Sequence, residues 1–372
     1  MIDMLQTALF YAASFVVVLT VIVFVHEYGH YRVARWCGVK VETFSIGFGK
    51  EIFGYTAKNG TRWKFCLIPM GGYVKMFGDA DPASSPNPDA VETFTDAEKS
   101  IAFHFKPLYK KAAVVFAGPL ANFILTITVM TGLFYFSGKQ TILPVVGEVV
   151  AGSAAEKAGI RVGDEFIAIG GKRIHAFADI KRAVTLNLGE PVEARIKRDG
   201  SETVISVTPE IKETTDIFGN TITLPVLGVA SSPKYSSYHK LPPIDAFIEA
   251  NKETYNFVTS TLTAVGQMIV GRRDVSEISG PIGIAKYSGQ SMQQGVQTVI
   301  WFIAVLSANL GLVNLFPIPA LDGGHLLYYA IEGLRGKPLA DKFQEVGIKI
   351  GIALISLFAA FAVYNDIVKL FK

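Results

Sequence analysis

Long uncharged runs alternate with polar segments along the chain. Met4 to Val25, Ala112 to Phe136 and Tyr287 to Leu321 contain no Asp, Glu, Lys or Arg, and Ile350 to Asn365 forms a fourth such run. A helix that crosses a bilayer core needs about 20 consecutive, mostly apolar residues. The pattern therefore predicts four transmembrane helices, which we place within residues 1–36, 107–137, 296–333 and 344–370.

A different period follows the first run. Residues 41–78 alternate apolar and polar positions, and Asn59-Gly60 occupies a typical two-residue turn. We predict a β-hairpin region with a following loop over residues 37–106. Its apolar side chains suggest that it enters the membrane, where backbone polar groups must be paired or buried in protein. Two interpretations remain open: an interfacial anchor, or an edge strand that takes up an extended substrate by β-addition.

The polar stretch after the second run predicts a folded domain. Residues 143–210 contain short strand patterns separated by turn signals such as Gly163-Asp164 and Asp199-Gly200. Residues 211–290 are interpreted as a connector with an amphipathic helix near 243–270. Charged residues interrupt that helix, so a position on the membrane surface is expected instead of a fifth span.

Composition agrees with a membrane protein, because half of the 372 residues are hydrophobic and only 18% are charged. Lys and Arg gather after the first span, before the second and between the third and fourth. Such segments face the cytoplasm, so both termini and residues 137–290 are expected outside. The two cysteines, Cys37 and Cys66, then lie on the cytoplasmic side. A net charge of +3 gives no indication of nucleic-acid binding.

The first span ends in an H-E-x-x-H motif. His26 and His30 are four residues apart and therefore share one helix face, where both imidazoles reach one metal ion. Glu27 lies beside that ion and is expected to accept a proton from the attacking water. Ionisable groups in an apolar helix are costly and usually functional.

A catalytic zinc site needs a third protein ligand. Asp322 follows the third uncharged run, three residues after Pro319, which with Pro317 is expected to break the helix. Counted at about 1.5 Å per residue, His26 and Asp322 lie at similar depths near the cytoplasmic side, so they are expected to meet. His325 is a rival ligand, but we favour a position facing the cytoplasmic water or a hydrogen bond to one of the metal-binding residues.

Two amide side chains in the third span have either a structural or a functional role. Asn309 and Asn314 are either interhelical hydrogen-bonding groups or parts of the site. We favour the structural role for Asn309. Asn314 is nearer the metal, and we favour a role in holding a substrate carbonyl or the developing oxyanion.

The chain resembles the site-2 protease family, specifically the bacterial regulator-of-sigma-E type. The resemblance is carried by His26 to His30, by the N-x-x-P-x-P-x-L-D-G sequence from Asn314 to Gly323, and by Gly118 to Asn122, a helix-packing motif. Pro69 to Lys75 and Ser279 to Gly283 also look like family signatures. Residues 143–210 resemble the circularly permuted PDZ domain of bacterial proteases, although some relatives carry two such domains.

The resemblance implies a polytopic α-helical membrane protein with four transmembrane helices, a membrane-associated β-hairpin region and one extracytoplasmic PDZ domain. It implies Zn²⁺ held by His26, His30 and Asp322, with Glu27 as catalytic base and Asn314 as substrate-binding residue. The expected partners are the lipid bilayer of the bacterial inner membrane and single-span membrane proteins, such as anti-sigma factors already trimmed by another protease, or signal-peptide remnants. The PDZ domain is expected to bind a peptide or C-terminus, or to act as a rigid plug.

Two other functions are compatible with parts of the pattern. A transporter would use His26, Glu27, His30 and Asp322 to relay protons or metal ions, but the sequence shows no inverted repeat. A membrane-tethered PDZ scaffold would not need an intact set of ligands and base.

Overall fold

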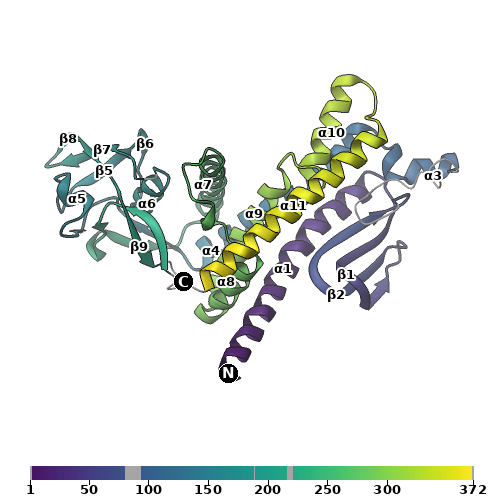
Figure 1. The fold of residues 1–372 in the computed structure, drawn as a ribbon, viewed down its shortest axis with the longest axis horizontal. Coiled ribbons are helices and arrows are strands. Elements are labelled where there is room, and N and C mark those ends of the chain that lie inside the picture. Colours follow the sequence, from purple (N-terminus) through teal and green to yellow (C-terminus); the bar gives the residue numbers. More distant parts are fainter. Residues whose placement is uncertain (1, 80–93, 188, 216–220, 371–372) are drawn as a thin grey trace. The chain divides into compact units, whose positions relative to one another are not determined.

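The computed structural model describes residues 2–79, 94–187, 189–215 and 221–370. The chain divides into two compact units, one comprising Met1–Val129 and Ile278–Lys372 and the other Met130–Glu277. Figure 1 labels the helices and strands of both units.

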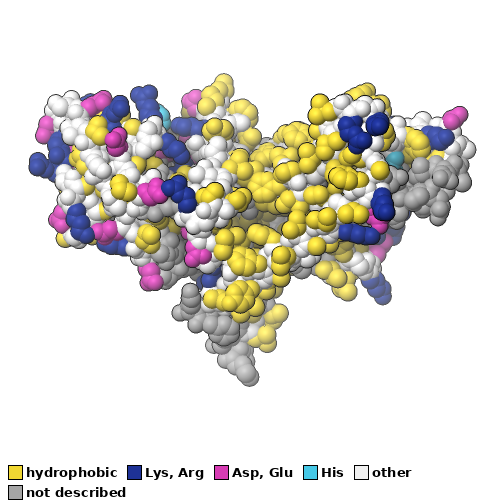
Figure 2. All heavy atoms as spheres, turned by 45° about the horizontal axis from the view of Figure 1, so that its top comes forward, with side chains coloured by type: hydrophobic (Ala, Val, Ile, Leu, Met, Phe, Trp, Pro, Cys, Tyr) yellow, Lys and Arg dark blue, Asp and Glu magenta, His cyan; other side chains and the backbone are white. Residues whose placement is uncertain are grey.

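Four helices are long and apolar enough to cross a membrane, among the residues that the structure describes. Each overlaps one of the four predicted spans, which confirms their number, although the third helix ends at Asn314 and not at the predicted residue 333. Figure 2 shows apolar side chains covering this part of the molecule with few charged interruptions. Large apolar groups such as Leu5, Leu357 and Phe358 are exposed on these helices, as expected for surfaces that meet lipid instead of water. The helices are α1 (Ile2–Trp36), α4 (Leu108–Phe136), α9 (Val296–Asn314) and α11 (Asp341–Leu370).

The third span breaks where the two prolines predict. Helix α9 ends at Asn314, and a non-helical segment leads to α10 (Asp322–Arg335). Ala320 in this segment has a φ of 84°, a backbone conformation that residues other than glycine rarely adopt. The segment folds tightly against its surroundings: a Cβ on Gly323 would overlap the carbonyl of Leu315, and one on Gly351 of α11 would overlap that of Pro319.

A helix that the sequence did not predict precedes α9. Helix α8 (Pro281–Gln294) occupies the end of the expected connector, and Gly295, with a φ of 106°, separates it from α9. Helix α8 packs along α1, where Gly289 leaves room for the Tyr11 ring. Its first turn receives the buried carboxylate of Asp366 from α11, which accepts hydrogen bonds from two backbone N–H groups.

The predicted hairpin is confirmed. Strands β1 (Val41–Thr56) and β2 (Arg62–Met76) flank a turn in which Gly60 has a φ of 85°, and they lie along α1 (Figure 1). The ladder is irregular, because Thr43–Ile46 have partners in both Arg62–Phe65 and Gly72–Lys75. Part of the expected loop, residues 80–93, lies outside the described residues, and its end is ordered as α3 (Asp96–Ile101) with η1 (Phe103–Phe105).

The second unit contains the folded domain predicted from residue 143. Its four-stranded sheet has the order β6-β5-β7-β8, and a short second sheet pairs β4 with β11. Phe166, Ile180 and Ile196 are buried in its core, together with Leu227. The core of this domain thus includes Leu227, which lies beyond the predicted boundary at residue 210. The elements are β4 (Glu148–Val149), α5 (Ala154–Lys157), β5 (Glu165–Ile169), β6 (Lys172–Arg173), α6 (Phe177–Thr185), β7 (Val192–Arg198), β8 (Ser201–Val207) and β11 (Val229–Ala230).

The expected amphipathic helix is present as α7 (Pro243–Ile269). Its acidic residues Glu249 and Glu253 pair with Lys139 at 2.6 and 2.8 Å, and Glu253 also pairs with Arg182 of α6 at 3.1 Å. Ile244, Phe247 and other apolar residues of α7 are exposed. The remaining elements of this unit are β3 (Lys139–Ile142), β9 (Glu210–Thr215), β10 (Thr221–Val226), η2 (Pro233–Tyr235), β12 (Ser236–His239) and η3 (Val275–Glu277); β3 pairs with β12 and β9 with β10.

Candidate metal centre

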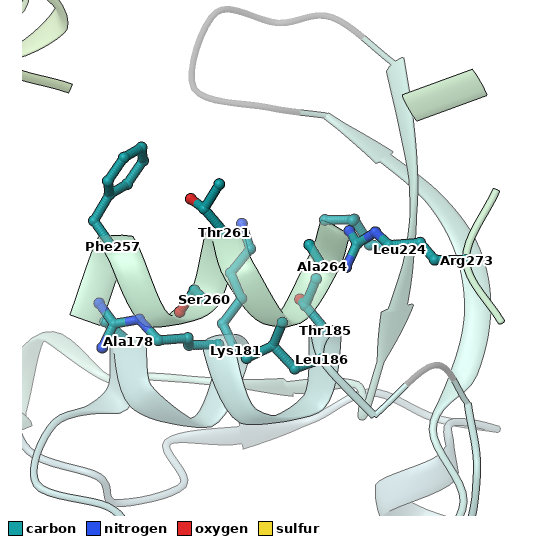
Figure 3. A pocket seen from close by; sticks show the side chains of 11 residues that line it. Ala178, Lys181, Thr185, Leu186, Leu224, Phe257, Ser260, Thr261, Ala264 and Arg273 are labelled. Atoms are coloured by element: carbon teal, nitrogen blue, oxygen red, sulfur yellow. The ribbon is translucent and has the colours of Figure 1, made fainter. Parts of the chain in front are cut away.

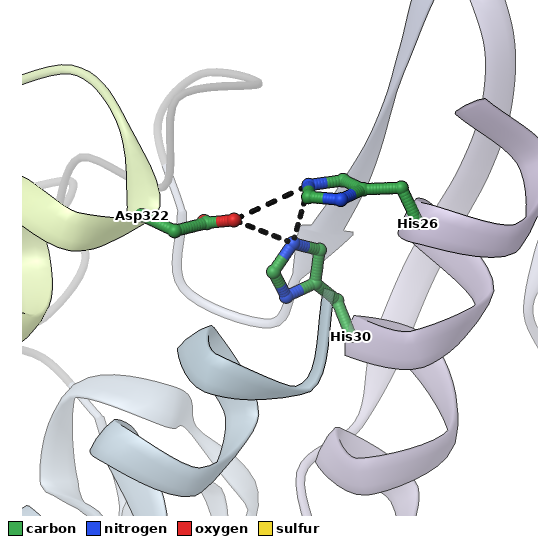
Figure 4. Close-up of side chains that lie close together, drawn as sticks. All are labelled: His26, His30 and Asp322. Carbon is green, nitrogen blue, oxygen red and sulfur yellow. Dashed lines mark hydrogen bonds and ion pairs between the residues drawn. The ribbon is translucent and has the colours of Figure 1, made fainter. Parts of the chain in front are cut away.

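Three side chains from distant parts of the sequence converge in the first unit. The Oδ2 atom of Asp322 lies 3.2 Å from Nε2 of His26 and 3.5 Å from Nε2 of His30. The two Nε2 atoms are 3.2 Å apart. Figure 4 shows the three groups pointing toward one another, the histidines from α1 and the carboxylate from the start of α10.

These spacings fit a zinc ion. Tetrahedral ligand atoms about 2.0–2.2 Å from zinc lie about 3.3–3.6 Å from one another, close to the three separations in this cluster. His26 is buried, and Oδ2 of Asp322 is a buried oxygen without a hydrogen-bond partner among the described residues. A buried carboxylate oxygen facing two ring nitrogens is costly to leave without a cation, so both the donor set and its geometry suit Zn²⁺.

Helix α1 supplies the two imidazoles, and α4 holds them. Nδ1 of His30 lies 2.9 Å from the backbone carbonyl of Val114, and Nδ1 of His26 lies 3.1 Å from the side-chain amide of Asn122. Gly118 lies between these contacts, where an added Cβ would overlap the ring of His30 and come within 2.9 Å of that of His26. One face of α4 therefore fixes both rings.

Glu27 follows the first ligand on α1. Its side chain is half-buried, and within the described residues it has no hydrogen bond or ion pair. The β2 strand passes directly beside it, since a Cβ on Gly72 would lie 3.0 Å from Cγ of Glu27. The carboxylate is thus available for proton transfer next to an extended segment of backbone.

The other residues singled out from the sequence lie around this cluster. Asn314 is the last residue of α9 and is half-buried. His325 lies one turn into α10, with its ring 6.4 Å from that of Tyr328, and does not join the three-residue cluster. Asn309 makes no interhelical hydrogen bond within the described residues, so its predicted structural role is not supported.

Interhelical bonding comes instead from residues that the sequence did not single out. The hydroxyl of Ser307 on α9 donates to the carbonyl of Asn122 at 3.0 Å, and Thr126 on α4 donates to the carbonyl of Ala304 at 2.9 Å. Gly118 and Asn122 belong to a motif that we interpreted only as helix packing. The sequence did contain an indication of their role, because Val114, Gly118 and Asn122 are spaced four residues apart and therefore lie on one face of the helix.

A second concave feature lies in the other unit, between α6, β10 and α7 (Figure 3). Its volume is about 410 Å³, and its walls are mainly apolar with cationic groups among them. Two of these cations are already paired, Arg182 with Asp179 and Arg273 with Glu277. The lining residues are Ala178, Lys181, Arg182, Thr185, Leu186, Leu224, Phe257, Ser260, Thr261, Ala264 and Arg273.

Comparisons with known proteins agree with the chemistry of the cluster. The model of peptidase family M50 matches residues 14–358. Two proteins named as zinc metalloproteases, from Agrobacterium fabrum and Rhizobium meliloti, are each 42% identical to the chain. The alignments cover 97% and 96% of the chain, respectively, and 96% of the length of each relative. Metalloprotease MmpA of Caulobacter vibrioides is 35% identical, over 95% of the chain and 94% of its own length. The chain therefore belongs to peptidase family M50, the site-2 protease family, and is a multi-pass membrane metalloprotease that uses zinc.

Proposed function

We propose that this protease cleaves single-span membrane proteins within the lipid bilayer. The observation that carries the proposal is the cluster of His26, His30 and Asp322, which is built from an apolar helix and the broken end of another. Soluble metalloproteases have no need for ligands on membrane-spanning segments, where ionisable groups are expensive.

In this mechanism, His26, His30 and Asp322 hold the metal. When bound, zinc supplies Lewis-acid polarisation of the scissile carbonyl and of water. Glu27 accepts the proton of the attacking water and passes it to the leaving amide nitrogen. The position of Glu27, one residue after the first ligand and without another partner in the described chain, supports this assignment.

Asn314 is proposed to hold the substrate carbonyl. It ends α9 at the point where the chain unwinds toward Asp322, and its amide has no partner among the described residues. An uncommitted amide donor at that position suits a carbonyl oxygen that gains negative charge during hydrolysis.

The substrate must unwind before cleavage, because the amides of a membrane helix are bonded internally. We propose that β2 captures the unwound segment by β-addition. Residues Gly72–Met76 pair with β1 on one side and have no strand partner on the other within the described residues, and Gly72 adjoins Glu27. Cysteines placed at Tyr73 and Lys75 should crosslink to alternate positions of a cysteine-scanned substrate; crosslinks without a two-residue period would refute strand pairing.

The apolar part of the hairpin supports its insertion into lipid. Ile52, Phe53, Leu67 and Ile68 are each more than half exposed. Exposed side chains of this size and number favour a lipid or substrate environment over water. The residues proposed to enter lipid and the Gly72–Met76 segment proposed to bind substrate therefore occupy different parts of the same hairpin.

The catalytic assignment is tested by Glu27→Gln, which keeps the shape of the side chain but removes the base. Zinc content should remain that of the wild type, while cleavage of a single-span model substrate falls by about 10²–10⁴-fold. Undiminished cleavage by the variant would refute the role of Glu27. Loss of zinc would show instead that Glu27 is a ligand.

For localisation, we propose the bacterial inner membrane, with both termini and the second unit on the periplasmic side. The support is the concentration of Lys and Arg in the segments after α1, before α4 and between α10 and α11. Natural substrates are proposed to be anti-sigma-factor-like proteins already shortened by another protease, with signal-peptide remnants as a further class. Cysteine labelling from either side of the membrane tests the orientation.

The folded domain of the second unit is proposed to be a PDZ domain that binds an extended peptide or a C-terminus. Its short strands, the turn sequence and the pocket beside α6 support this proposal. The exposed Lys181 is a cation on the pocket rim without an ion pair in the described residues. Leu224→Glu should weaken binding of apolar peptides, and unchanged binding would remove this pocket from consideration.

A further inference from the structure

Asn122 occupies a fully buried position beside the candidate metal centre. Its Nδ2 atom lies 3.1 Å from Nδ1 of His26, on the side of that ring opposite to Asp322. The backbone of Asn122 is fixed independently, since its carbonyl accepts a hydrogen bond from the hydroxyl of Ser307 on α9 at 3.0 Å. The side-chain amide is therefore not needed to pack α4 against α9.

The two histidines differ in what holds their Nδ1 atoms. A neutral imidazole that binds a metal through Nε2 carries its proton on Nδ1. For His30 this tautomer is enforced, because Nδ1 faces the carbonyl of Val114, which only accepts hydrogen bonds. For His26 the partner is an amide, which presents a donor or an acceptor according to its rotation.

In this arrangement the amide donates to Nδ1 of His26, so the ring proton lies on Nε2, which is 3.2 Å from the acceptor Nε2 of His30. Oδ1 of Asn122 is then buried without a hydrogen-bond partner in the described chain. Half a turn of the amide exchanges its oxygen and nitrogen without backbone movement. The oxygen then accepts Nδ1–H, and the Nε2 lone pair of His26 faces the metal position.

We propose that Asn122 is a positioning residue that selects the metal-binding tautomer of His26. The amide donates to Nδ1 while Nε2–H of His26 faces Nε2 of His30, and it accepts from Nδ1 when His26 binds zinc. This inference rests on the proposed zinc site. It assigns to α4 a role in ligand chemistry beyond helix packing, with Val114 and Asn122 acting on His30 and His26 respectively.

Two substitutions separate this role from simple packing. Asn122→Leu keeps the branched shape but removes both polar atoms, and it should weaken zinc binding by about 10–100-fold, the usual effect of removing a partner of a ligand histidine. Asn122→Asp supplies only acceptors, so it should select the metal-binding tautomer and keep zinc affinity at or above that of wild type. Thr126→Val is the control, because it removes an adjacent buried hydroxyl that does not touch His26.

Zinc affinity is measured on the full-length protein in detergent by competition with a chelator, with the thermal midpoint recorded for each variant. The proposal predicts a large loss for Asn122→Leu, affinity restored in Asn122→Asp, and nearly wild-type affinity in Thr126→Val. Equal affinities of Asn122→Leu and wild type would overturn it. Equal losses in the Leu and Asp variants would also overturn it, because packing alone predicts that result. A wild type that binds no zinc would instead refute the underlying metal site.

Discussion

Gly118 on α4 provides the sharpest test of how the protein shapes the metal centre. An ideal Cβ at this position would overlap Nε2 of His30, one of the three proposed ligand atoms, and would lie 2.9 Å from Cε1 of His26. Carbon and nitrogen atoms in contact are normally about 3.5 Å apart. Gly118→Ala therefore forces the His30 ring to move by about 1 Å or α4 to withdraw.

A zinc site tolerates much smaller errors. Ligand distances normally agree with ideal values to within about 0.2 Å, so a ring displaced by about 1 Å no longer acts as a ligand. With only two protein ligands left, we expect zinc affinity to fall by more than the 10–100-fold typical of changes to groups that only orient the ligands. Cleavage should fall at least in proportion.

Gly132 on the same helix offers a matched control. Nothing lies within 4 Å of the Cβ that alanine would add there, and alanine is the better helix former. Both variants would be purified at full length, and their zinc content and affinity compared by chelator competition with wild type. Retention of wild-type zinc affinity by Gly118→Ala would refute the close packing of α4 against the two histidines of α1.

Two further predictions concern other buried carboxylates. Burial raises the pKa of Asp164, but hydrogen bonds from the Arg198 side chain and the Arg161 backbone outweigh burial and lower it. A carboxylate whose pKa is lowered by folding stabilises the domain above its unfolded pKa of about 4, and this contribution is lost as the pH falls through that value and below. The thermal midpoint of wild type should therefore drop more steeply on acidification than that of Asp164→Asn. Parallel curves for the two proteins would contradict the lowered pKa of Asp164. Asp366→Ala removes the acceptor of the Gly280 and Gly283 N–H groups, both 2.9 Å away, and should cost about 1–3 kcal/mol of stability. Asp366→Asn retains one acceptor oxygen and should cost less. Equal stability of Asp366→Ala and wild type in a denaturant titration would contradict the role of Asp366 in holding the start of α8.

The sequence was sufficient for features that depend on local pattern. Four uncharged runs predicted the four long helices, and Pro317 with Pro319 predicted the break before Asp322. Counting residues along the spans also predicted that His26 and Asp322 meet, and the structure brings their side chains within 3.2 Å of each other. Each of these inferences uses only helix geometry and the cost of burying charge.

Features that depend on tertiary partners were not predictable in the same way. Helix α8 is less apolar than the spans, and it is held by contacts with α1 and by Asp366 near the opposite end of the sequence. The pairing of β11 with β4 was not predictable, because β11 is a two-residue strand whose partner lies far earlier in the chain. Asn122 acquires its contact with His26 only through the packing of α4 on α1. Side-chain periodicity does not encode such pairings.

Metal analysis of the purified full-length protein tests the central claim most directly. Wild type should contain one zinc ion per chain, as the three-ligand cluster requires. Asp322→Ala should lose the zinc, whereas His325→Ala, which alters the neighbouring histidine outside the cluster, should retain it. Retention of zinc by Asp322→Ala together with its loss from His325→Ala would contradict the assignment of the third ligand and the mechanism built on it.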